Sequence, residues 1–185
     1  HESDRFIFEE LLADSGHLRE IYFTGGEPFI NRQVRRIIDV LVERGDHRHI
    51  VLQFNSNFTS LDDELMATLA KFKAISLAAS IDAAGRYYEY IRHPAKWARV
   101  TANVEKVLNL PNLHLSFVPI ISAYNALNIV DLCQYCDSIG VNFSLHDLGG
   151  NDNIDLGVLP PMARRLAIER LRTYAGSGCR PQNLH

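Results

Sequence analysis

The sequence is poor in cysteine, and it has neither a long run of charges of one sign nor a long apolar run. Three cysteines among 185 residues are too few and too unevenly placed for a disulfide framework, which predicts a reducing, cytoplasmic setting. The formal net charge is −3 without a basic cluster, so neither nucleic acid nor a membrane surface is expected as a partner. No apolar stretch approaches the roughly 20 residues that cross a bilayer. The 46% of hydrophobic residues suffice for one domain with a substantial core.

Five short runs rich in Ile, Val, Leu and Phe predict β-strands. They lack clean polar alternation, which is typical of strands covered on both faces, as in a parallel sheet. The runs are Arg19–Phe23, His49–Phe54, Ala74–Ile81, Leu113–Ile121 and Val141–His146.

Helical periodicity separates these runs. Ser60 is a candidate N-cap, and Gly45 is a candidate helix stop. Strands that alternate with helices predict an α/β fold with a parallel sheet, and five βα units predict an incomplete barrel or an open sheet, because a closed eight-stranded barrel needs about 250 residues. The expected helices are Asn31–Arg44, Ser60–Lys71, Lys96–Leu110, Asn125–Ile139 and Pro160–Tyr174, with an acidic amphipathic stretch, Asp4–Ala13, before the first strand.

Polar residues follow every predicted strand, at the end where parallel α/β folds bind ligands. Such residues also favour turns and helix caps for purely local reasons, so a single polar loop carries little weight. They are Gly25, Gly26 and Glu27; Asn55, Ser56 and Asn57; Ser80 and Asp82; Ser122 and Asn125; and His146 and Asp147.

The pair Gly25-Gly26, followed by Glu27 and Pro28, is the most unusual of these loops. Two residues without side chains let a ligand approach the backbone closely, and a carboxylate beside free carbonyl groups makes a cradle of acceptors. Such a cradle suits a cation with several N–H donors, for example an α-ammonium group. The simpler alternative is a strand-to-helix turn in which Pro28 begins the next helix.

Two further features allow two interpretations each. Ser80 and Asp82 lie two residues apart, which places both side chains on one side of a strand and suits a diol or a carboxylate–hydroxyl pair; the alternative is a helix cap. The aromatic residues Tyr87, Tyr88, Tyr90 and Trp97 either roof a substrate pocket or, more commonly, close a core.

In that order, the segments IYFTGGEP, FNSN, AASIDAAG with YEYIR, and WARVTANVEKV resemble radical S-adenosylmethionine (radical SAM) enzymes, in particular the twitch/SPASM-type branch. The resemblance runs from about Glu20 to His146. It implies a partial (β/α)6 barrel that binds S-adenosylmethionine beside a [4Fe-4S] cluster. It also implies a 5′-deoxyadenosyl radical that abstracts hydrogen from a small-molecule or peptide substrate, with an electron donor such as flavodoxin or ferredoxin.

The same resemblance assigns roles to individual residues. Gly25, Gly26 and Glu27 match the site of the methionine amino group. Ser80 and Asp82 match positions at the ribose or the methionine carboxylate, and Arg92 matches an arginine that pairs with that carboxylate. The remaining matches are two loop residues near the site, Asn57 and Asn125.

The sequence departs from the family pattern in two places. It contains no C-x3-C-x2-C cluster motif, so the cluster ligands are expected upstream of His1. Asn55-Ser56-Asn57 stands where relatives often carry Thr-Asn-Gly. We divide the chain into a barrel core, residues 1–147, and residues 148–185, an irregular segment with a C-terminal helix that could begin a twitch-type extension.

The cysteines do not replace the missing motif. Cys133 and Cys136 lie on the apolar stripe of an expected helix, which indicates buried core thiols without metal. Cys179 lies in a turn-rich tail, where either an auxiliary-cluster ligand or a free thiol fits.

Two other function classes remain open. One is a cluster-free binding module that keeps the acceptor cradle. The other is a non-radical lyase or hydrolase that uses Glu27, Asp82 and His146 as acid and base, for which these three side chains must lie close together.

Overall fold

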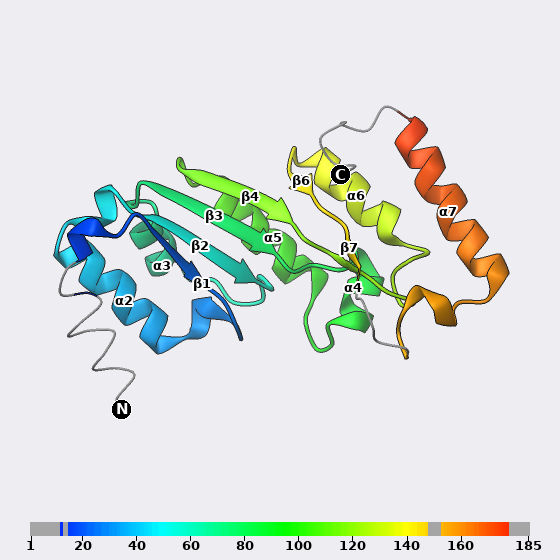
Figure 1. The fold of residues 1–185 in the computed structure, drawn as a ribbon, viewed down its shortest axis with the longest axis horizontal. Coiled ribbons are helices and arrows are strands. Elements are labelled where there is room, and N and C mark those ends of the chain that lie inside the picture. Colours follow the sequence, from blue (N-terminus) through cyan, green and yellow to red (C-terminus); the bar gives the residue numbers. More distant parts are fainter. Residues whose placement is uncertain (1–11, 13–14, 148–152, 178–185) are drawn as a thin grey trace. The chain divides into compact units, whose positions relative to one another are not determined.

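The computed structural model describes residues 12, 15–147 and 153–177 (Figure 1). Its main sheet has five strands in the order β1-β2-β3-β4-β6, and a second sheet pairs β5 with β7. β1 runs parallel to β2, β4 to β6, and β5 to β7. The α/β fold with a five-stranded parallel sheet, as a partial radical SAM barrel would have, is therefore confirmed. The strands are β1 Glu20–Phe23, β2 Val51–Ser56, β3 Ala74–Ala79, β4 Leu113–Phe117, β5 Ile120–Ile121, β6 Asn142–Phe143 and β7 His146–Asp147.

Six α-helices lie in the described part of the chain, joined by short 3-10 turns. The α-helices are α2 Arg32–Glu43, α3 Asp63–Leu69, α4 Gly85–Ile91, α5 Trp97–Leu108, α6 Ile129–Ser138 and α7 Pro161–Gly176, and the 3-10 turns are Ser15–His17, Pro28–Ile30, Asp46–Arg48 and Leu156–Val158. Apart from Leu12, the stretch Asp4–Ala13 lies outside the described residues, and so do residues 148–152 and Cys179.

Several predicted boundaries are wrong for identifiable reasons. The N-cap of α3 is Asp62 and not Ser60, because the Asp62 carboxylate accepts the Leu65 N–H at 2.7 Å. The predicted strand Leu113–Ile121 breaks after Phe117, where Pro119 has no N–H to donate to a sheet. The prediction missed α4, a seven-residue helix rich in tyrosine. By contrast, Gly45 follows α2 with a φ of 82°, as a helix stop requires.

The chain forms two compact units, which we describe separately: the first comprises His1–Ala78 with Asn103–His114, and the second comprises Ala79–Ala102 with Leu115–His185. In the first unit, β2 alternates fully buried with half-buried residues, so neither face is open to solvent. Its buried aromatic cluster joins Phe23 to Phe54, with ring centroids 5.1 Å apart, and Phe29 to both Phe54 and Phe58. Phe23 is the last residue of β1 and Phe54 lies near the end of β2, so the cluster includes residues next to the polar loops that follow both strands.

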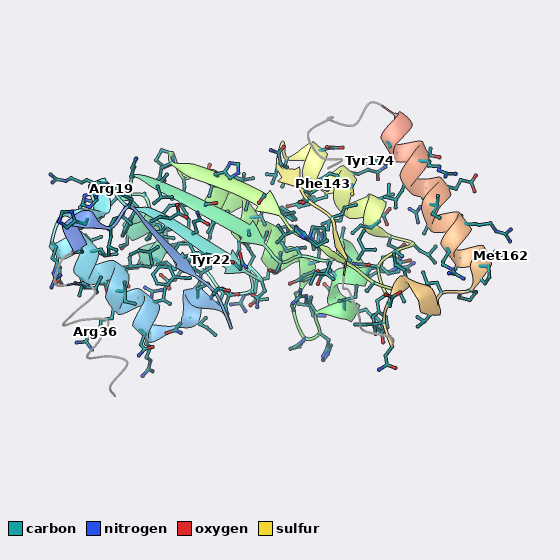
Figure 2. All side chains as sticks on the ribbon, viewed as in Figure 1. Arg19, Tyr22, Arg36, Phe143, Met162 and Tyr174 are labelled. Carbon is teal, nitrogen blue, oxygen red and sulfur yellow. The ribbon has the colours of Figure 1, made fainter. Side chains whose placement is uncertain are left out.

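The second unit has its own aromatic core. Trp97 contacts Tyr88 and Tyr135, with centroids 5.5 and 5.1 Å apart, and Tyr135 contacts Phe117. Helix α7 packs on α6, where Tyr174 donates to Asp137 at 2.5 Å; its ring also faces Phe143 of β6 (Figure 2). None of the described helices is long and apolar enough to cross a membrane.

Candidate functional site

Both glycines of the loop after β1 adopt left-handed backbone conformations. Gly25 has a φ of 86° and Gly26 a φ of 58°, which residues with a side chain rarely adopt. A Cβ atom built at either position would meet no atom of the described residues within 4 Å. The turn therefore presents bare backbone to open space, which is the arrangement needed for close approach by a ligand.

Glu27 connects the loop after β1 to the loop after β2. Its Oε1 accepts the Ser56 hydroxyl at 2.8 Å and the Phe29 N–H at 3.4 Å, and its Oε2 accepts the Asn57 N–H at 2.8 Å. A carboxylate offers about four acceptor positions, so one on Oε2 has no partner among the described residues. Glu27 is thus held in place by its neighbours and can still accept one further donor.

The loop after β2 is held by several hydrogen bonds at once. Asn57 Oδ1 accepts the Thr59 N–H at 2.9 Å and the Thr59 hydroxyl at 2.6 Å, which forms a local turn. Ser56 Oγ accepts the Phe58 N–H at 3.0 Å, and the buried Asn103 donates to the Phe58 carbonyl at 2.7 Å. These bonds fix the Asn57 amide N–H that binds Glu27.

Phe58 occupies the left-handed region with a φ of 58°, and its ring is fully buried. A non-glycine residue in this region costs roughly 1–2 kcal/mol, which the buried ring offsets.

We expect Phe58→Gly to be more stable than Phe58→Ala by about 0.5–1 kcal/mol, although both variants lose the ring at a cost of about 3–5 kcal/mol. Only glycine relieves the left-handed backbone. The measurement is urea denaturation, with Phe54→Gly and Phe54→Ala as matched controls in an extended strand. At position 54 alanine should be the more stable variant, and the same order at position 58 would contradict the backbone argument.

In the second unit, Asp82 and Arg92 form an ion pair. Arg92 donates from Nε at 2.7 Å and from Nη2 at 2.5 Å to Asp82 Oδ2, while Oδ1 accepts the Ile120 N–H at 3.0 Å. Asp82 is buried, whereas the Arg92 side chain is 35% exposed. Two of the five guanidinium N–H groups bind Asp82, and the others bind no other described residue, so they can bind a ligand.

Asn125 binds the backbone on both sides of this ion pair. Its side chain donates to the carbonyls of Asp82 and Ile120, at 2.8 and 2.7 Å, and accepts the Ser122 N–H at 2.8 Å. The residue is fully buried, and its amide is used by these three bonds. Asn125 therefore ties the loop after β3 to the loop around β5.

Ser80 follows β3, which ends at Ala79 rather than at Ile81 as predicted. The Ile81 N–H bonds to the Ala79 carbonyl at 2.9 Å, so residues 80–82 have already left the strand ladder. Ser80 is half-buried, and its hydroxyl makes no hydrogen bond to another described residue.

A cavity of about 630 Å³ opens beside the ion pair in the second unit. It combines charged, hydroxyl and apolar groups. Its lining consists of Asp82, Tyr90, Ile91, Arg92, Ile120, Ser122, Tyr124 and Ile154.

The structure gathers the predicted site residues into two groups. Gly25, Gly26, Glu27 and Asn57 come together in the first unit, and Asp82, Arg92 and Asn125 in the second. Sequence reasoning named Ser56 among the polar residues after the second strand but gave it no role, and it gave none to the backbone N–H of Ile120. No cluster of three or more His, Cys, Asp or Glu side chains suited to a metal occurs within residues 12, 15–147 and 153–177.

The predicted burial of Cys133 and Cys136 on α6 is confirmed, with exposures of 1% and 0%. Burial raises the pKa of the Cys136 thiol well above its ordinary value of 9.0, and the neighbouring Cys133 and Asp137 raise it further.

We expect the Cys136 thiol of the native protein to resist iodoacetamide at about pH 8 and to react once guanidinium unfolds the chain, because only the thiolate is nucleophilic. The thiol stays protonated in the fold, so its contribution to stability is complete below 9.0 and declines as the pH rises above that value. Mass spectrometry of labelled peptides measures the extent of labelling, and rapid labelling of the native protein would contradict the expectation.

The Cys133→Ala/Cys136→Ala variant of the whole, cluster-reconstituted protein should keep its iron content.

Comparison with known proteins finds one matching family model and several similar folds. The sequence model of the radical SAM superfamily matches residues 4–136. The fold is similar to Streptococcus suis SuiB (13% identity, TM-score 0.63, covering 95% of this chain and 40% of that chain). It is also similar to native anSMEcpe with bound AdoMet (13% identity, TM-score 0.66, covering 94% and 50%). The chain thus spans half or less of these proteins, and at such identities the likeness shows the fold alone.

A third similar structure is SuiB bound to the precursor peptide SuiA (14% identity, TM-score 0.67, covering 98% of this chain and 40% of that chain). A search of the curated proteins found no match.

Proposed function

The chain belongs to the radical SAM superfamily, and from this premise we propose that it is the core of an enzyme that binds S-adenosylmethionine beside a [4Fe-4S] cluster. The observation that carries the proposal is the glycine turn with Glu27. A buried ammonium group must exchange its water hydrogen bonds for protein acceptors, and Oε2 of Glu27 keeps one acceptor position next to bare backbone. We assign the methionine amino group to Gly25, Gly26 and Glu27, with Asn57 beside them.

We assign the methionine carboxylate to Arg92. Its remaining N–H groups suit a carboxylate, and Asp82 and Asn125 hold the guanidinium and the neighbouring loop in place. Both oxygens of Asp82 already have partners, which favours a positioning role over direct ligand contact. Ser80, whose hydroxyl makes no bond to a described residue, is the better candidate for a ribose contact.

When both are bound, the [4Fe-4S] cluster and S-adenosylmethionine would supply reductive cleavage of S-adenosylmethionine to a 5′-deoxyadenosyl radical, which takes a hydrogen atom from the substrate. The residues of this chain would orient the cofactor and exclude water. We further propose that the cluster thiolates lie upstream of His1, where the family resemblance places them. Residues 1–147 would then be the barrel core, residues 148–185 would lead into a twitch-type extension, and a flavodoxin or ferredoxin would donate electrons.

We propose a peptide as the substrate class, because similar structures contain the precursor peptide SuiA in SuiB and the Kp18Cys peptide in anSMEcpe. A lyase or hydrolase that uses Asp82 as a base is less well supported, because the Asp82 carboxylate is committed to Arg92 and the Ile120 N–H.

The decisive experiment uses the whole protein, reconstituted with iron and sulfide without oxygen. Calorimetry should detect S-adenosylmethionine binding, and reduction with dithionite should release 5′-deoxyadenosine. Arg92→Gln should weaken binding by about 10-fold or more, since a hydrogen bond to a charged group contributes about 1.5–3 kcal/mol. Lys106→Gln removes a cation from an exposed pair with Asp63 and is the matched control. A protein that binds S-adenosylmethionine but holds no iron and releases no 5′-deoxyadenosine would be a cluster-free module. A protein that does not bind S-adenosylmethionine would refute the proposal.

A further inference from the structure

Two exposed tyrosines line the cavity of the second unit. Tyr90 on α4 is 71% exposed and Tyr124 after β5 is 52% exposed. Their ring centroids are 6.1 Å apart and their planes are inclined by 59°, so the rings are tilted and not stacked. Adjacent exposed aromatic rings on a cavity wall are characteristic of recognition surfaces, because their apolar area stays in contact with water until a ligand covers it.

The backbone that carries Tyr90 is anchored by the unit's core. Tyr88, two residues earlier, is fully buried against Trp97. Residues two apart on a helix do not share a face, so burial of Tyr88 turns Tyr90 outward. Glu89 accepts the Trp97 N–H at 3.1 Å and thereby fixes the start of α5 against α4.

The backbone that carries Tyr124 is fixed as well. The Tyr124 N–H donates to Ser122 Oγ at 3.3 Å, and the Ala123 N–H donates to the Ile154 carbonyl at 2.9 Å. Asn125, the next residue, is fully buried. Both rings therefore stand on ordered backbone, and a tyrosine loses little conformational entropy when a ligand immobilises it.

The rest of the cavity complements a ring attached to a peptide. Ile91, Ile120 and Ile154 add apolar surface, while Ser122 adds a polar group to the lining. The volume of about 630 Å³ lies within the range of roughly 300–1,000 Å³ that ligand cavities occupy.

We propose that the Tyr90–Tyr124 pair is a substrate subsite that receives an aromatic side chain of a peptide. This inference rests on the proposed function, and it specifies which feature of a peptide this cavity recognises. Tilted rings offer one face and one edge, which is the environment that an incoming aromatic ring prefers. Of the four aromatic residues considered from the sequence, Tyr88 and Trp97 close the core and Tyr90 faces the cavity.

The test uses the whole, cluster-loaded protein and two acetylated, amidated probe peptides, Gly-Gly-Trp-Gly-Gly and Gly-Gly-Leu-Gly-Gly. Dissociation constants come from NMR titration, with and without S-adenosylmethionine. The tryptophan peptide should bind the wild type about 3- to 10-fold more tightly than the leucine peptide. Tyr90→Ala and Tyr124→Ala should each weaken the tryptophan peptide by about 5- to 30-fold, and Tyr90→Phe and Tyr124→Phe should retain most of the affinity.

Tyr22→Ala is the matched control, because Tyr22 on β1 is exposed to the same 52% as Tyr124 and lies in the first unit (Figure 2). Circular dichroism should show equal melting temperatures for all variants. If the alanine variants weaken S-adenosylmethionine as much as the peptide, the pair serves the adenine ring and the inference is overturned. Equal affinity for both peptides also overturns it. Failure of the wild type to bind S-adenosylmethionine, with peptide discrimination intact, would refute the proposed function alone.

Discussion

Replacing Glu27 by glutamine in the whole, cluster-loaded protein should lower its affinity for S-adenosylmethionine by about 10- to 100-fold. The open acceptor position on Oε2 would be lost or neutralised, and a hydrogen bond to a charged group contributes about 1.5–3 kcal/mol. The measurement is isothermal titration calorimetry on both proteins.

The same substitution should also lower the free energy of unfolding by about 1–3 kcal/mol, because an amide cannot accept both the Ser56 hydroxyl and the Asn57 N–H in the present geometry. Glu27 contributes to the fold because it joins the loop after β1 to the loop after β2. Ser56→Ala is the control: it removes one donor to Oε1 and keeps the charge, so it should cost stability with a much smaller loss of affinity. If Glu27→Gln and Ser56→Ala lost equal affinity, Glu27 would act only through the loop.

Asn125→Ala should destabilise the protein by about 3–5 kcal/mol, the largest expected effect of any polar substitution that we consider. It removes three hydrogen bonds and takes this partner from the carbonyls of Asp82 and Ile120 and from the Ser122 N–H. Thermal and urea denaturation measure the loss. Asn109→Ala, which removes one exposed side-chain bond to a backbone carbonyl, should change stability by less than about 0.5 kcal/mol.

Asn125→Asp separates hydrogen bonding from shape. Aspartate has nearly the same volume, but it places an oxygen against the carbonyls of Asp82 and Ile120. We therefore expect a loss at least as large as for alanine. A variant that melts like the wild type would show that the site depends on packing volume and not on the three bonds.

The sequence predicted most of the elements because their signals are local. Glycine at position 45 ends α2, and Asn31, whose side chain accepts the N–H groups of Gln33 and Val34, begins it. The apolar runs that became β1, β2 and β3 were placed to within two residues at all six of their ends. These features depend on side chains a few residues apart, which a single sequence displays directly.

The elements that sequence reasoning missed depend on distant contacts. Helix α4 has seven residues and three tyrosines, a composition with weak helix propensity, and Tyr88 packs against Trp97. Both Ser60 and Asp62 can cap a helix, and the hydrogen bond from the Leu65 N–H goes to Asp62, which also pairs with Arg35 of α2. In both cases the local alternatives, helix or loop at α4 and Ser60 or Asp62 as N-cap, differ little in free energy. Contacts with other parts of the chain decide between them.

The sequence by itself determined the family, the alternation of strands and helices, and the loop in which two glycines precede a carboxylate. Only the tertiary structure decided what each polar group does. Glu27 binds a backbone N–H 30 residues away, and Asn125 bonds to a carbonyl 43 residues away. The physical reason is that a buried polar atom must find a partner when the chain excludes water, and that partner is set by which loops the sheet brings together. The side-chain amide of Asn125 therefore bonds within the protein, whereas Arg92 bonds to Asp82 and keeps further N–H donors for a ligand.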